Sequence, residues 1–172
     1  MSYLTRETFL KKVAASGSKY WQEGKNYRWQ YMSYVIDILR EMFPNGGRFC
    51  EAGASGILLY EDSCNFEYPQ HDLNKIPYRI LGGHVIPDNF FDCFVALQVW
   101  EHLDNQERAF KEVMRISKSA ILSFPYMWPK GKGHDARHVG IDDIKIKQWT
   151  CGVKPEKTKL INNRMVCVWI FK

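Results

Sequence analysis

The clearest pattern in the chain is a helical one between Tyr27 and Phe43. Apolar residues recur there every three to four positions, at 29, 32, 35, 36, 39, 42 and 43, and Pro44-Asn-Gly-Gly47 follows as a stop signal. This spacing predicts an amphipathic helix with one buried face. A weaker helical pattern covers Leu4–Ala15, and aromatic residues are concentrated between the two segments. Such residues are typical of core packing, although they also line acceptor pockets.

Three segments further along the chain have strand patterns. Arg48–Ala52 predicts a short strand, and Phe91–Leu97 predicts a central parallel strand because it is apolar on both faces. Ser119–Phe124 predicts the next strand. Between the last two, we expect Asp104 to cap a helix, with Glu107 completing a capping box and an inner face at positions 110, 113, 114 and 117.

The stretch between the first and the central strand is short and weakly patterned. We expect Leu58–Tyr60 to continue as a helical turn and Phe66–Leu73 to form a second strand, with Pro69 suited to an edge or a strand end. Only 36 positions separate Gly56 from Asp92, which is short for two helices and two strands. Either this half of the sheet is trimmed, or one helix is replaced by a loop.

The last third of the chain predicts a loop over residues 126–140, a short helix over Ile141–Trp149 and a hairpin. Two apolar runs, 159–161 and 165–171, flank Asn162-Asn163, which is typical of a hairpin turn. Helix and strand patterns therefore alternate up to a final hairpin, which predicts an α/β fold with a mostly parallel sheet and an antiparallel strand at its end. We expect one domain, 1–172, made of a helical segment over 1–46 and an α/β core over 47–172.

Composition narrows the class of protein. Hydrophobic residues make up 45% of the chain, no run of 18 apolar residues is present, and the charged N-terminus is unlike a signal peptide, so a soluble cytoplasmic protein without membrane contact is expected. Five cysteines are scattered without a Cys-x-x-Cys pair and are expected to be reduced. The net charge of +5 predicts a solvated basic surface, and the absence of a recognition-helix pattern argues against a nucleic-acid partner. No pattern indicates an oligomeric state.

The turn Glu51-Ala-Gly-Ala-Ser-Gly56 carries the first candidate chemistry. A glycine-containing turn between a strand and a helix lets the backbone approach a ligand closely, and the helix N-terminus favours negative charge. Asp72 lies 19 residues after Gly53, about where a carboxylate accepts hydrogen bonds from ribose hydroxyls. Glu61 and Asp62 are alternatives, but they follow the turn too closely to leave room for a helix. A tight connection that binds no ligand is the other interpretation of this turn.

Four stretches together resemble class I S-adenosylmethionine-dependent methyltransferases. They are the glycine turn, Ile86-Pro-Asp-Asn-Phe-Phe-Asp92, Val95-Ala-Leu-Gln-Val-Trp-Glu-His102, and the helix and strand up to Pro125. The most similar group is the small-molecule, type 11-like branch, whose members have a Pro-Asp-x-x-Phe-Asp segment and a Leu-Glu-His segment. The resemblance implies a Rossmann-like three-layer sandwich that transfers a methyl group from S-adenosylmethionine to a small-molecule or sugar-like acceptor.

The same resemblance implies which residues bind the cofactor. The methionine end would lie against Glu51 and the backbone of Gly53, Ala54, Ser55 and Gly56, and the ribose against Asp72. The methionine and sulfonium side would be lined by Ala96, Leu97 and Gln98. Backbone groups around 83–85 would bind the adenine, because no acidic residue precedes the Pro-Asp-x-x-Phe-Asp segment.

A methyl transfer depends mainly on the position of the acceptor, and a general base is needed only for a poor nucleophile. His138 and His134, in the loop after the strand that ends at Pro125, are candidates for that base. His102 is another candidate, although packing or capping is the simpler role for it. His134, Asp135 and His138 make only a weak metal motif, so no metal site is expected.

Departures from the family pattern keep a second hypothesis open. Ser55 stands where the family usually has a second glycine, and Ile57 where it often has a third. The alternative is a non-catalytic methyltransferase-like domain that acts as a partner or regulatory subunit. A nicotinamide-dependent enzyme fits less well, because residues 53–56 make a poor Gly-x-Gly-x-x-Gly motif. A nucleic-acid methyltransferase is not indicated either, because Ala96-Leu-Gln-Val99 stands in place of an Asn-Pro-Pro-Tyr motif.

Overall fold

The computed structural model describes residues 2–80, 83–128 and 140–171, and six strands in these residues form one sheet in the order β2-β1-β3-β4-β6-β5. The bounds of the strands are β1 Phe49–Ala52, β2 Cys64–Phe66, β3 Cys93–Leu97, β4 Ser119–Pro125, β5 Lys157–Ile161 and β6 Arg164–Ile170. The first four are parallel to one another, whereas β6 is antiparallel to β4 and β5 is antiparallel to β6. The predicted mostly parallel sheet with an antiparallel hairpin at its end is therefore confirmed.

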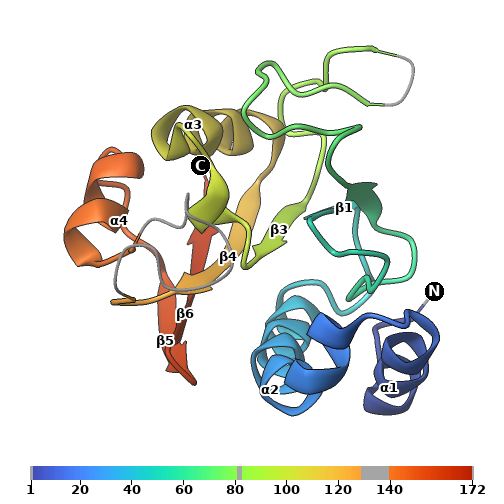
Figure 1. Ribbon diagram of the computed structural model, residues 1–172. Helices are drawn as coiled ribbons and strands as arrows, with labels where there is room; N and C mark the ends of the chain where they lie inside the picture. Colours follow the sequence, from blue (N-terminus) through green and yellow to red (C-terminus); the bar gives the residue numbers. More distant parts are fainter. Residues whose placement is uncertain (1, 81–82, 129–139, 172) are drawn as a thin grey trace.

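Helices cover both faces of the sheet and complete a three-layer sandwich (Figure 1). On one face lie α1, Arg6–Ala15, and α2, Lys19–Met42; on the other lie α3, Gln106–Ile116, and α4, Asp143–Trp149. Alternate residues of β3 point to opposite layers, so that Val95 packs with α2 while Ala96 packs with α3. This explains why β3, Cys93–Leu97, is apolar at every position. No helix in the described part of the chain is long and apolar enough to cross a membrane.

The helix α2 begins at Lys19, eight residues earlier than the pattern predicts. Ser18 caps it by accepting the N–H of Trp21, and the guanidinium of Arg28 lies 3.6 Å from the ring centroid of Tyr20. Position 24 suits glycine, because a Cβ there would collide with that guanidinium. The aromatic segment before the predicted helix is thus its first two turns.

The N-terminus of α3 differs from the prediction. Asn105, and not Asp104, caps the helix, since its side-chain oxygen accepts the N–H of Arg108 at 2.9 Å. The predicted capping box is wrong because Glu107 pairs with Lys111 instead, at 2.6 Å. The predicted α4 and its neighbouring loop are partly corrected as well: α4 begins at residue 143, and residues 129–139 of the predicted loop lie outside the described residues.

The middle of the chain is trimmed. The strand β2 ends at Phe66, so the prediction of a strand over Phe66–Leu73 is wrong; turns follow it because Pro69 cannot continue a paired strand. The predicted helical turn at Leu58–Tyr60 is wrong too, because the backbone N–H groups of this segment bond to the carboxylate of Glu51. Among the described residues between β1 and β3, no helix forms at all.

The Pro-Asp-x-x-Phe-Asp segment lies at the amino ends of the parallel strands. Asp92 accepts hydrogen bonds from the backbone N–H of Arg48 at 2.9 Å and from Nζ of Lys118 at 2.8 Å. The bond from Lys118 is the main reason that the pKa of Asp92 is lowered. One carboxylate therefore joins the starts of β1, β3 and β4. The Pro-Asp-x-x-Phe-Asp segment thus has a structural role, at the edge of the sheet opposite the carboxyl ends of the parallel strands.

Candidate functional site

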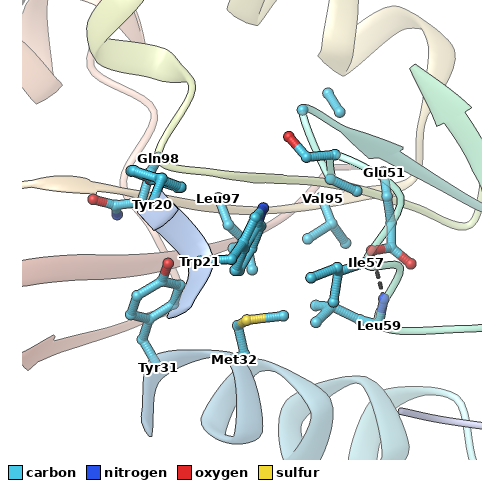
Figure 2. Close-up of a pocket in the computed structure, with 14 residues that line it drawn as sticks. Tyr20, Trp21, Tyr31, Met32, Glu51, Ile57, Leu59, Val95, Leu97 and Gln98 are labelled. Carbon is cyan, nitrogen blue, oxygen red and sulfur yellow. Dashed lines mark hydrogen bonds between the residues drawn. The ribbon is translucent and has the colours of Figure 1, made fainter. Parts of the chain in front are cut away.

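A cavity of about 230 Å³ lies between α2 and the carboxyl ends of β1 and β3 (Figure 2). Ligands of open α/β sheets bind at this edge. Six residues that the sequence assigned to a cofactor line the cavity, namely Glu51, Gly53, Ala54, Ser55, Leu97 and Gln98. Three others do not: Gly56, Asp72 and Ala96, the last of which is buried among side chains of the opposite layer.

The glycine turn has three residues with left-handed backbone, of which only two are glycine. Gly53, Ser55 and Gly56 have φ angles of 68°, 49° and 78°, in the left-handed region. A Cβ at Gly53 would collide with Cγ2 of Val99, whereas a Cβ at Gly56 would meet nothing within 4 Å. Gly53 is therefore required for packing against the end of β3, and the space beside Gly56 is open.

Glu51 is buried behind the turn, with only 3% of its surface exposed. Its carboxylate accepts the N–H of Leu59 at 2.8 Å, the N–H of Tyr60 at 3.0 Å and the hydroxyl of Ser63 at 2.6 Å. Burial raises the pKa of Glu51, and these hydrogen bonds oppose the rise. The carboxylate thus fixes the connection between β1 and β2, which contains Leu59, Tyr60 and Ser63 and forms no helix.

A second acidic residue at the turn is Glu67, which sequence reasoning missed. It follows β2 directly, and its carboxylate accepts the backbone N–H of Ser55. Gly53 also donates its N–H to the carbonyl of Phe66, at 2.9 Å, so the two strand ends are joined. Sequence reasoning placed Glu67 inside a strand, because it expected the second strand to begin at Phe66, where β2 in fact ends.

Asp72 lies in a separate cavity of about 320 Å³ beyond β2. Its carboxylate accepts the N–H of Asn74 at 3.0 Å and lies 3.6 Å from Nζ of Lys75. In the same cavity, the ring of His71 stacks on Phe66 with centroids 4.4 Å apart. The structure therefore does not bring Asp72 together with the glycine turn.

Gln98 stands at the end of β3 with a φ angle of 60°, which is costly for a residue with a side chain. Its backbone N–H donates to the carbonyl of Ser123 at 2.8 Å, and its Nε2 donates to the hydroxyl of Ser123 at 3.0 Å. Backbone strain of this kind gathers at binding sites. Across the cavity, Trp21 and Tyr31 of α2 form an aromatic wall (Figure 2).

Of the predicted catalytic residues, His138 lies outside the described residues, as do His134 and Asp135. His102 lies in the 3₁₀ helix η1, Trp100–His102, and its side chain is 39% exposed. It does not line the cavity beside Gln98. Within the described part of the chain, no group of histidine, cysteine or acidic residues could hold a metal ion.

Comparisons with known proteins agree with this fold. A family model described as a methyltransferase domain matches residues 58–120, which is 63 of the 172 residues and begins just after the glycine turn. No curated protein matches the sequence.

Several solved structures share the fold at low identity. A methyltransferase from Haloferax volcanii, in complex with the Trm112 methyltransferase activator, is 10% identical with a TM-score of 0.61, over 92% of this chain and 96% of that one. An S-adenosylmethionine-dependent methyltransferase from Thermotoga maritima is 12% identical with a TM-score of 0.53, over 88% and 100%. The N-terminal domain of EvdMO1, solved with S-adenosylhomocysteine and D-fucose, is 11% identical with a TM-score of 0.55, over 82% and 83%. The predicted resemblance to class I S-adenosylmethionine-dependent methyltransferases is confirmed.

Proposed function

We propose that this chain binds S-adenosylmethionine and transfers its methyl group to a small-molecule acceptor. The observation that carries the proposal is the cavity at the carboxyl ends of β1 and β3, which joins the glycine turn, the strained Gln98 and the aromatic wall of α2. When bound, the cofactor supplies an activated methyl group on a positively charged sulfur.

The residues present fit an adenosine cofactor in outline. The left-handed turn over 53–56 offers backbone groups beside open space at Gly56, where a ligand can approach closely. Glu67 takes the role expected of Asp72, because it directly follows β2 and accepts the N–H of Ser55, whereas Asp72 lies in a separate cavity. The hydrogen bond from Ser55 to Glu67 would then give way to one from a ribose hydroxyl.

The cavity is smaller than the roughly 300–1,000 Å³ of most ligand sites. Binding therefore requires a side chain at its mouth to shift, and Tyr20 is the best candidate because it is 57% exposed. The acceptor would lie on the side of Gln98 and the aromatic wall.

Calorimetric titration of the full chain with S-adenosylmethionine and S-adenosylhomocysteine tests the proposal. We expect heat of binding for both and a rise in melting temperature, since a ligand at 100 times its Kd stabilises a fold by about 2.7 kcal/mol. Absence of heat together with an unchanged melting temperature would overturn the proposal.

A second candidate is a non-catalytic domain with the same fold, acting as a partner or regulatory subunit. The small cavity favours it, and so does Glu51, whose carboxylate is already engaged by Leu59, Tyr60 and Ser63. A protein that melts at the same temperature with and without either ligand would support this candidate.

A further inference from the structure

Glu101 is a buried acid whose carboxyl group is only partly used by the fold. It lies in η1, three residues after Gln98, and is 2% exposed. Its Oε2 has no hydrogen-bond partner, and its Oε1 lies 3.8 Å from Nε2 of His102. Leaving such an oxygen unpaired costs about 1–3 kcal/mol, and a catalytic role is one of the reasons for which a protein retains such a group.

Arg164 presents a complementary donor. It begins β6, and its positive charge acts on Glu101. Its Nε is also buried without a hydrogen-bond partner. Its guanidinium lies 4.9 Å from the ring centroid of Tyr27, which continues the aromatic face of α2, and 4.6 Å from that of Trp128. The unpaired oxygen of Glu101, three residues after Gln98, and the unpaired Nε of Arg164 therefore belong to two side chains whose charges interact.

This inference rests on the proposed methyltransferase activity and assigns its acceptor. We propose that the methyl acceptor is a hydroxyl or amine compound that binds between Glu101 and Arg164, and that Glu101 is the base that takes its proton. The acceptor oxygen or nitrogen forms a bond to the methyl carbon while the bond from that carbon to sulfur breaks, its electron pair staying on sulfur. The proton of the acceptor moves to Oε2 of Glu101 and reaches solvent past the half-exposed His102.

The surroundings of Glu101 suit a base that works near neutral pH. Burial raises the pKa of Glu101 to about 8, and the positive charge of Arg164 opposes the rise. Arg164 on β6 and His102 on η1 are the charged or titratable side chains that face it among the described residues. A base is most effective when its pKa is close to the working pH.

The first test requires no cofactor. In the full chain with ¹³C-labelled glutamate, the carboxyl signal that disappears in Glu101→Gln should titrate with a midpoint near 8. Arg164→Met should raise that midpoint, because it removes the opposing charge. A midpoint near the ordinary glutamate value of 4.5 would overturn the inference.

The second test measures methyl transfer from S-adenosylmethionine to a set of small phenols, alcohols and amines. Glu101→Gln should lower kcat by about 100-fold or more and abolish the rise of kcat between pH 6 and about 8, with the Kd of S-adenosylmethionine unchanged. Glu101→Asp should retain part of the activity. Glu107→Gln, which removes an exposed carboxylate on α3, is the matched control and should behave as the wild type.

The outcomes separate the two proposals. If Glu101→Gln transfers methyl groups at the wild-type rate, the role of Glu101 is refuted while the methyltransferase assignment stands. If the wild type binds the cofactor but methylates none of the hydroxyl and amine compounds, the acceptor class is refuted. If the wild type binds no S-adenosylmethionine, both proposals fail.

Discussion

The backbone N–H of Ser55 donates a hydrogen bond to the carboxylate of Glu67. This bond ties the turn after β1 to the first residue beyond β2, across the carboxyl edge of the sheet. It also places a carboxylate where a nucleoside hydroxyl would compete for it. Glu67 and Asp72 are therefore distinguishable by experiment, since only one of them lies beside the turn.

We expect Glu67→Gln to raise the Kd of S-adenosylhomocysteine by about tenfold or more, because a hydrogen bond to a charged group contributes about 1.5–3 kcal/mol. Asp72→Asn, which removes a charge in the neighbouring cavity, should change the Kd by less than about twofold. Calorimetric titration of both variants provides the measurement. A larger loss for Asp72→Asn would return the ribose site to the residue predicted from the sequence.

Gly53→Ala should destabilise the fold more than Gly56→Ala. Both residues have left-handed backbones, for which a side chain costs about 1–2 kcal/mol, but only the Cβ at position 53 also collides with Val99. We expect a difference of at least about 1 kcal/mol between the two free energies of unfolding, measured with urea. Val99→Ala in the Gly53→Ala background should recover part of the loss, and equal costs for the two glycines would contradict the packing argument.

Glu51→Gln should act mainly on stability. Its amide group would place a donor against N–H groups of Leu59 and Tyr60 that need an acceptor, which should cost about 2–3 kcal/mol. Ser63→Ala removes a single bond to the same carboxylate and should cost about 1 kcal/mol. Urea unfolding at pH 7 gives both values; a stable Glu51→Gln protein that fails to bind cofactor would instead make Glu51 a ligand.

The stability of the wild type should fall as the pH rises from about 4.5 to about 8. The folded state holds the proton of Glu101 up to about pH 8, whereas the unfolded state loses it near the ordinary value of 4.5, so ionisation favours unfolding over this range. At 1.36 kcal/mol per pH unit, the effect is at most about 5 kcal/mol. Glu101→Gln should flatten this part of the curve of unfolding free energy against pH, while Glu107→Gln should not; parallel curves for all three proteins would show that Glu101 ionises normally.

Gly24→Ala should loosen the aromatic wall. A methyl group there displaces the guanidinium of Arg28, which is 3% exposed and lies against Tyr20, Trp21 and Tyr27. Cation–π contacts of this kind contribute about 0.5–2 kcal/mol each, so we expect a loss of about 1–3 kcal/mol, although alanine is otherwise the better helix former. Unfolding monitored by tryptophan fluorescence checks this, and a gain in stability would show that Arg28 moves without cost.

The sequence predicted the parts of the fold that repeat a pattern over many residues. The strand β3 was evident because each of its positions is apolar, which follows from its burial between two helical layers. The hairpin of β5 and β6 was equally evident from the Asn162-Asn163 turn, whose two residues have φ angles of 49° and 60°.

Features that depend on contacts distant in the sequence were missed. The strand β2 has three residues, too few for any periodicity, and is defined by its pairing with β1. The first turns of α2 are stabilised by Arg28, which reaches back over Tyr20. Glu67 became a candidate only once the end of β2 was fixed, and Glu101 had no assigned role until its burial was known.

The two walls of the cavity come from parts of the chain more than 60 residues apart, Trp21 and Met32 on α2 and Val95 and Gln98 at the end of β3. If α2 detaches, one wall is lost while the parallel strands remain paired. A molecule held between the walls is released when α2 detaches, so its binding free energy is added to the cost of that partial opening. Amide hydrogens of α2 should then exchange with solvent more slowly when the site is occupied, by the same factor as those of β3, so that hydrogen exchange of a helix reports on occupancy of the site.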